Sequence, residues 1–505
     1  MSASLRYGTG VWPTAERLAR ERGRARFLAA AALMGVAAGY GAVVVVAQGS
    51  PLLAVPIAGA FVGIMLFVWP RSGLYALLGA AVLFEEWGIA GLEPITAQTH
   101  FFQNVSGFTE VPLRLSMADM LALLTLGAWG LRRMVGVNEP ARAGPVGGPV
   151  LAYGVLFALG LFVGMSRGGS WWEIAALAEL RAPVFLCLTY FLTVNMIREP
   201  RHVAIVLRLL LGLIAVKALQ GLANYLDMLN GSRWLEAVTA HEDVVFLDLV
   251  IILALAAALL RVRTRLALLA FSVAPIAMAT ELVTQRRVAF IALGAALVVL
   301  AVLLAAQHPQ RTIATFGLAV AVFAGYAALF WDQQGLLAEP IRAIKGTIDP
   351  TALSARDLAS NWWREIEDMN IAYTIRQLPL TGVGLGQQYL FLREPPELTN
   401  FVYWRYMTHD AVLWVWLKAG LAGFLAFWTL VGQTAIVGAR LFRLLPSPQL
   451  KLLAVVPITL IVIQVVFSSV DLGLTYTRCM IVLGVALGLT AYLADQVRPS
   501  RVTAS

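Results

Sequence analysis

The chain has 505 residues, of which 59% are hydrophobic and only 13% are charged, and its formal net charge is +9. A soluble core cannot bury that much apolar surface, so the composition excludes the soluble classes and predicts an all-α protein that crosses a membrane many times. The positive charge lies mostly in short segments between apolar runs, which indicates membrane topology and argues against a nucleic-acid partner.

The N-terminal region, residues 1–26, is basic and is expected to lie in the cytoplasm. It carries five arginines between Arg17 and Arg26, directly before the first apolar run. That run is about 20 residues long, which exceeds the apolar core of most cleaved signal peptides. We therefore expect it to remain as a signal-anchor.

Fourteen apolar runs are long enough to cross the ~30 Å of a hydrocarbon core. Eleven lie within residues 27–331 and three within 408–495. They cover residues 27–47, 52–69, 74–92, 116–131, 149–166, 175–197, 203–225, 244–260, 266–283, 288–306, 312–331, 408–432, 452–469 and 479–495. Lysine and arginine are concentrated in alternate connections, so both termini, including the tail 496–505, are predicted to be cytoplasmic.

One connection, residues 332–407, is far longer than the others and is predicted to be extracytoplasmic. A loop of roughly 75 residues in a compact protein indicates function or disorder, and its many aromatic residues argue against disorder. Residues 355–378 show the apolar spacing of an amphipathic helix lying at a membrane surface. On it, the acidic residues Glu365, Glu367 and Asp368 are interpreted as a solvated face in preference to a metal site.

Ionisable residues inside the apolar runs are functional candidates because they are costly to place in a bilayer. Nearly all of them fall in the predicted outer half, which favours a polar cavity opening outward over isolated structural ion pairs. Arg181 lies about 9 Å below the outer end of its predicted helix. Arg286 and Arg287 form a cationic pair on a short outer turn. Each of these arginines could bind an anionic substrate or serve a structural role.

Three short motifs carry a resemblance to a known family. The first is PLTGVGLG at 379–386, and the second is His409-Asp410 at the start of an apolar run, followed by Leu413, Gly420 and Gly423. The third is Thr284-Gln285-Arg286-Arg287. Together with the many spans and the long loop before His409, they make the chain similar to the O-antigen ligase and O-antigen polymerase superfamily of membrane glycosyltransferases.

The chain departs from the family pattern at several positions. Asp410 stands where asparagine is common, Lys418 where glutamate is frequent, and Arg286 where serine is common. Arg356 and Trp363 lie further apart than the family's usual arginine and tryptophan. Arg364 or Arg376 could therefore take the place of Arg356.

The resemblance implies a GT-C-like fold that transfers a glycan from an undecaprenyl-pyrophosphate carrier to an acceptor hydroxyl at the outer face of the bacterial inner membrane. It implies His409 as general base and Arg287 as a second catalytic residue, an inverting reaction, and no cofactor or metal ion. The implied substrate-binding residues are Arg181, Arg286, Arg356, Arg364, Arg376 and Asp410. The chemistry suits these residue types, because histidine titrates near neutral pH and arginine binds phosphate bidentately.

Several alternatives remain open from the sequence. A ligase, which glycosylates lipid A-core or another acceptor, and a polymerase, which extends another lipid-linked repeat, share these motifs. A lipid-linked glycan transporter or flippase is the main competing function, and a scaffolding membrane protein is a third. His409 could be merely an interfacial histidine, and the glycine-rich turn is interpreted as a sharp turn in preference to a phosphate cradle.

Overall fold

The computed structural model describes residues 34–35, 54–88, 94–136, 140–231, 237–349, 353, 355–399 and 401–497. The chain divides into two compact units, residues 1–65 and 66–505, and everything below concerns the second unit unless stated. The predicted basic N-terminus lies outside the described residues, as do nearly all of the first predicted span and residues 498–505. In the described part the regular structure is helical, with a single isolated β-bridge between Asn104 and Ser116, so the predicted all-α class is confirmed.

Thirteen long helices follow one another along the described chain, with two further helices in the long connection before His409. The long ones are α2 (Ala54–Val68), α3 (Pro70–Leu83), α4 (Met117–Met134), α5 (Gly147–Arg167), α6 (Glu173–Met196), α7 (Pro200–Asn230), α8 (Asp243–Leu259), α9 (Arg265–Thr284), α10 (Arg287–Ala305), α11 (Pro309–Phe330), α14 (Ala411–Leu444), α15 (Pro448–Ser468) and α16 (Thr477–Val497). The two in the connection are α12 (Glu339–Ile348) and α13 (Ala355–Gln377). Each predicted run from 52 onward therefore corresponds to a helix.

Nine helices of the described residues, namely α5, α6, α7, α9, α10, α11, α14, α15 and α16, are long and apolar enough to cross a membrane. A tenth span is obtained if Gly59–Val68 and Pro70–Leu83, which meet at a bend of 114°, count as one broken span. The chain is thus a multi-pass α-helical membrane protein. The predicted number of fourteen spans and the side on which the long connection lies stay predictions.

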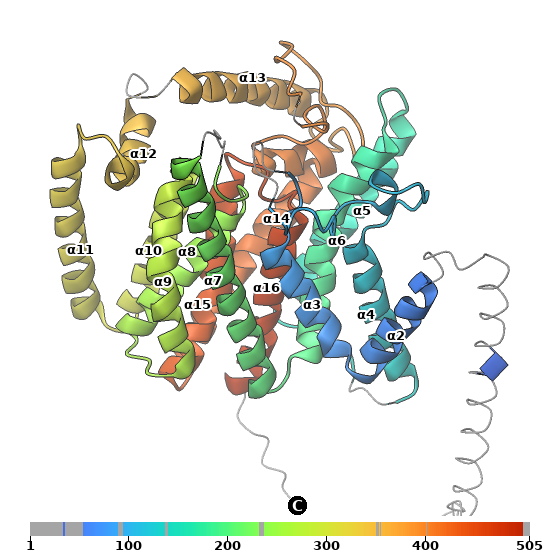
Figure 1. The fold of residues 1–505 in the computed structure, drawn as a ribbon, viewed down its shortest axis with the longest axis horizontal. Coiled ribbons are helices and arrows are strands. Elements are labelled where there is room, and N and C mark those ends of the chain that lie inside the picture. The colour runs from blue at the N-terminus through green and yellow to red at the C-terminus, as the bar shows by residue number, and fades with distance from the viewer. Residues whose placement is uncertain are drawn as a thin grey trace, which may run out of the picture. The chain divides into compact units, whose positions relative to one another are not determined.

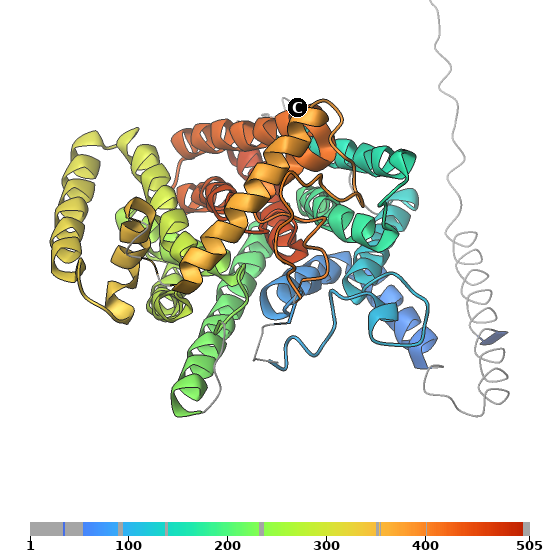
Figure 2. The same cartoon turned by 90° about the horizontal axis from the view of Figure 1, so that it is seen from above.

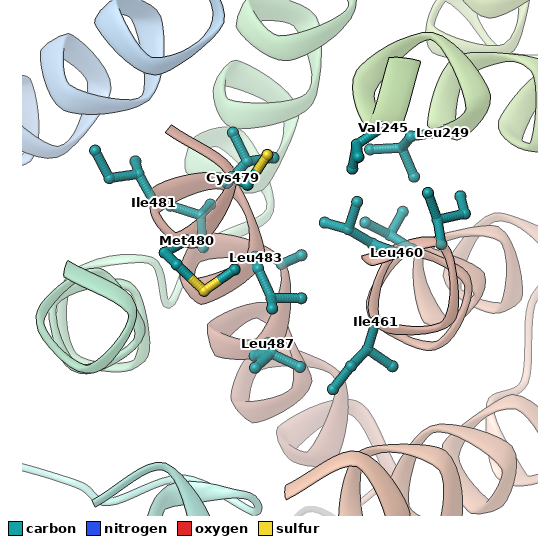
Figure 3. Close-up of a cluster of buried hydrophobic side chains, with 14 of the residues drawn as sticks. Val245, Leu249, Leu460, Ile461, Cys479, Met480, Ile481, Leu483 and Leu487 are labelled. Carbon is teal, nitrogen blue, oxygen red and sulfur yellow. The ribbon is translucent and has the colours of Figure 1, made fainter. Parts of the chain in front are cut away.

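Helix α16 forms the centre of the core. Almost all of its residues are buried, and Figure 3 shows Leu483 on the side of α16 that faces Leu460 and Ile461 of α15. Small residues allow its backbone to approach α6 closely, because a Cβ on Gly484 would lie 2.2 Å from Thr189 Oγ1. Helix α11 is the least buried of the spanning helices, because no residue in its most apolar stretch is buried. It lies at one edge of the bundle (Figure 1).

Most of the buried charges are paired with one another. Arg478 is fully buried and donates to Glu242 and Asp243, while Lys217 contacts Glu85. Because an unpaired buried charge is strongly destabilising, these pairs hold the helices that carry them in register. Structural ion pairs thus account for charges that the sequence attributed to an outward-opening polar cavity.

Asp248 and Glu281 are the exception among the buried charges. Both are fully buried, and their carboxyl groups are hydrogen-bonded to each other.

The glycine-rich turn is wedged between α5, α6 and α14. Gly382, Gly384 and Gly386 all have positive φ, at 65°, 86° and 77°. A Cβ on Gly164 of α5 would lie 2.0 Å from Leu385 O, so only glycine permits this approach. The turn therefore fixes the path of the chain that leads from α13 to α14.

Helix α13 runs across one end of the bundle, as Figure 1 shows from the side and Figure 2 from above. Its existence as a helix over 355–377 confirms the sequence prediction. Three of the apolar residues that defined the predicted stripe, Leu358, Trp362 and Met369, are exposed. The opposite face of α13 packs over the start of α14, and it is this face that builds the candidate site.

Candidate active site at the start of helix α14

His409 is the last residue but one before α14, and α13 holds it in place. Its backbone amide donates to Glu367 Oε2 at 2.9 Å, and its ring Nδ1 lies 3.2 Å from the same oxygen. The ring packs edge-on against Trp363, with centroids 5.1 Å apart. The side chain of Glu367 is 0% exposed and that of His409 is 22% exposed, so a buried carboxylate supports a solvent-accessible imidazole.

This geometry determines which ring nitrogen can act as a base. When Nδ1–H donates to Glu367, the Nε2 lone pair is available, and no described residue is hydrogen-bonded to Nε2. Burial alone would lower the pKa of His409, but the charge and hydrogen bond of Glu367, helped by Asp471, raise the pKa above its ordinary value. A raised pKa makes the neutral imidazole a stronger base.

A second acidic group, Asp471, faces the same region from the connection between α15 and α16. Its carboxylate lies 3.5 Å from His241 Nδ1. Burial raises the pKa of Asp471, but His241, His409 and Arg286 together lower it below its ordinary range. Asp471 is therefore in contact with His241 and within electrostatic reach of His409 and Arg286.

Arg287 attaches helix α10 to helix α13. Its guanidinium donates to Asn361 Oδ1 at 3.1 Å and lies 3.7 Å from Asp357 Oδ1. Arg364, on the same helix as Asn361, lies within electrostatic reach of His409. Arg364 and Arg286 thus lie within electrostatic reach of His409 and Asp471, respectively, whereas the partners of Arg287 lie six and ten residues along α13 from Glu367, or about 9 and 15 Å. The predicted anion-binding role of these arginines stays a prediction.

Arg181 lies apart from this group. Its guanidinium forms two hydrogen bonds with Asp119, at 3.2 and 2.8 Å, and donates to Asn104 and to the carbonyl of Phe102. Four acceptors from the protein therefore occupy it, and no described contact joins it to His409. Its predicted role in substrate binding stays a prediction.

The two remaining loop arginines lie at a distance along α13. Arg376 is exposed in the last turn, nine residues or about 14 Å beyond Glu367. Arg356 lies in the first turn, and its side chain is outside the described residues. Arg364 is thus the α13 arginine that the structure places beside His409.

Asp410 has a structural role that the sequence left undecided. Its side chain accepts a hydrogen bond from Leu413 N at 2.8 Å and so caps the N-terminus of α14. Burial raises its pKa to about 6, although the amides of Leu413 and Val412 oppose the shift. Glu367, and not the adjacent Asp410, is therefore the group that orients His409.

The glycine-rich turn does not offer its amides to a phosphate. Val383 N donates to Leu417 O at 2.7 Å, Leu385 N to Gly160 O at 2.9 Å, and Gly386 N to Glu179 Oε2 at 2.6 Å. Beneath the turn, Glu179 also forms a fully buried ion pair with Lys418 at 2.8 Å. The preferred interpretation of a sharp turn is therefore confirmed.

Three residues of the site were missed or misassigned by the sequence. Glu367 was interpreted as part of a solvated helix face. This is wrong, because Glu367 lies on the buried face of α13, whereas three of the apolar residues that defined the predicted stripe are exposed. Asp471 and His241 were not singled out. Both lie in short segments between apolar runs on the predicted outer side, and that shared side was the signal available in the sequence.

No group of three or more His, Cys, Asp or Glu side chains among the described residues could hold a metal ion. Comparison with known proteins adds no family assignment: no protein-family model matches the chain, and no curated protein matches it. The resemblance to the O-antigen ligase and polymerase superfamily therefore rests on the three motifs and on the predicted topology.

Proposed function

We propose that this protein is a membrane glycosyltransferase that transfers a glycan from an undecaprenyl-pyrophosphate carrier to an acceptor hydroxyl. The observation that carries the proposal is the His409–Glu367 pair, in which a buried carboxylate supports a partly exposed imidazole within electrostatic reach of Arg364.

In the proposed reaction His409 acts as general base. The acceptor oxygen attacks the anomeric carbon of the donor sugar while its proton passes to Nε2 of His409. The bond between the anomeric carbon and the pyrophosphate oxygen breaks, and the electron pair leaves with the undecaprenyl pyrophosphate. Glu367 stabilises the imidazolium that forms, because its charge favours the protonated ring.

Arginines would bind the leaving pyrophosphate. Arg286 lies within electrostatic reach of Asp471, and Arg287 is the first residue of α10 and lies 3.7 Å from Asp357 of α13. Guanidinium groups match phosphate oxygens bidentately and stabilise the charge that develops as the bond breaks. Arg364 is the third candidate. Because Arg287 already lies 3.7 Å from Asp357, a phosphate would compete with that carboxylate for it.

A strain that lacks the chromosomal copy and carries plasmid-borne variants tests the proposal. With the wild-type chain we expect polymerised or ligated glycan, and with His409→Ala we expect loss of that product and accumulation of lipid-linked glycan. Arg287→Ala should give the same pattern, while the exposed His308→Ala, at the start of α11, should behave as wild type. Product retained with both His409→Ala and Arg287→Ala would reject the enzyme. Lost product with the lipid-linked glycan accumulating on the cytoplasmic leaflet would point to a transporter.

A further inference from the structure

A cavity of about 640 Å³ lies at the other end of α14 from His409. It is formed where α14 and α16 end and α5 begins, at the end of the bundle opposite α13 (Figure 1). From Gly420 to Leu444, helix α14 extends about 36 Å, so this cavity is separate from the candidate active site. Its position at the ends of three membrane-spanning helices places it at the depth of lipid headgroups.

The lining of this cavity combines positive charge with an apolar wall. The charged residues that line it are Arg142, Arg440 and Asp495, and Arg142 Nη1 lies 2.6 Å from Asp495 Oδ2. One positive charge is therefore left in excess. Its apolar lining comes from Val437, Leu441 and Leu444 of α14 and from Ala491, Ala494 and Val497 of α16.

The polar edge of the cavity is built before any ligand arrives. Asn195 holds the loop by accepting from Arg142 N at 2.8 Å and donating to Arg142 O at 3.1 Å, and Tyr190 donates to Ala143 O. Arg142 Nε is buried and has no hydrogen-bond partner among the described residues. The adjoining N-terminus of α5 has no side-chain cap, so its partial positive charge adds to that of the arginines.

We propose that this cavity binds an anionic phospholipid, with the phosphate on Arg142 and Arg440 and an acyl chain against the wall of α14 and α16. Basic pockets between membrane helices suit anionic headgroups, and a soluble anion would make no use of the apolar wall. The residues after Val497 do not complement the cavity, because they include Arg498 and Arg501 but no acidic residue.

Thermal unfolding of the purified full chain in detergent tests the site. Dioleoylphosphatidylglycerol should raise the unfolding midpoint of the wild type, because a ligand that binds the folded state stabilises it, while dioleoylphosphatidylcholine should not. In Arg440→Gln, the lipid concentration giving half of the shift should rise about tenfold, the effect of losing one charge-assisted hydrogen bond. Arg443→Gln, an exposed arginine one turn further along α14 that does not line the cavity, should respond as wild type.

Three results would overturn the proposal. The first is equal stabilisation by the two lipids, and the second is an equal response of Arg440→Gln and Arg443→Gln. The third is a full shift of the unfolding midpoint with inorganic phosphate alone, which would indicate a site for a free anion. If Arg440→Gln does not fold, Ala494→Phe replaces it as the test variant, because the added ring fills the cavity. The lipid should then no longer raise the unfolding midpoint of Ala494→Phe, whereas it should still raise that of Gln496→Phe. Because the readout is lipid binding, it is independent of the proposed glycosyltransfer.

Discussion

Glu367 controls the proton affinity of His409, and this gives the first prediction at the scale of single residues. Removing its charge in Glu367→Gln lowers the pKa of His409. His409 serves as a base only when neutral, so the transfer rate rises as pH passes upward through its pKa. The rise should therefore occur at lower pH in Glu367→Gln than in the wild type, with a reduced maximal rate because the imidazolium loses its support.

The measurement is the pH–rate profile of transfer with both variants purified in parallel. Glu365→Gln is the matched control, because Glu365 lies on the same helix but is exposed. A merely structural role for Glu367 would lower the rate at every pH without moving the profile. An unmoved acid limb would thus contradict the claim that Glu367 sets the pKa of the base His409.

Asp410 gives the second prediction, which concerns stability. Because its carboxylate caps α14, Asp410→Ala should lower the free energy of unfolding by about 0.5–2 kcal/mol, whereas Asp410→Ser should retain most of it. Thermal unfolding in detergent measures both. Loss of transfer in Asp410→Ser despite normal stability would instead show that the carboxylate contacts substrate.

At the scale of secondary structure, the packing of the glycine-rich turn against α5 is the feature most sensitive to substitution. Gly164→Ala places a methyl group against Leu385 O and should destabilise the fold by about 1–3 kcal/mol. Gly294→Ala in α10 has nothing within 4 Å of the added Cβ and should be neutral or stabilising. Comparison of the two unfolding midpoints measures the difference, and equal midpoints would contradict the close approach.

The elements also show what the sequence can predict. The long apolar runs predicted the spanning helices correctly, because a helix that crosses a membrane must have that length and composition. Helix α13 was predicted from the spacing of its apolar residues alone. Bounds were less accurate: α7 reaches Asn230, and α14 continues to Leu444 through a non-helical Gly420. Local spacing does not reveal such extensions, because they depend on packing against neighbours.

At the scale of the whole molecule, the contacts between distant segments were beyond prediction. His409 meets Glu367 across 42 residues, and Arg478 meets Glu242 across 236. The sequence placed many ionisable residues on one side of the membrane, but only the fold decides which of them neutralise each other. Arg181 and Lys418 are such cases, since Asp119 and Glu179 pair with them.

The order of the last helices predicts the sidedness of the site. Three spans, α14, α15 and α16, separate His409 from Val497, so the two lie on opposite sides of the membrane. In a chain whose two native cysteines are replaced, we expect a membrane-impermeant maleimide to label Gln377→Cys on intact spheroplasts. Gln496→Cys should react only after permeabilisation. Labelling of both positions from one side would contradict this arrangement.

The central claim, that His409 is the base of a glycosyl transfer, is tested most directly by the release of undecaprenyl pyrophosphate from a purified donor. The donor is the lipid-linked glycan that accumulates in the deletion strain, membrane lipid of the same strain supplies the acceptor hydroxyl, and the protein is reconstituted in nanodiscs. We predict that His409→Ala lowers the initial rate by about 10²-fold or more and that His308→Ala does not. A folded His409→Ala variant that releases undecaprenyl pyrophosphate at the wild-type rate would contradict the account.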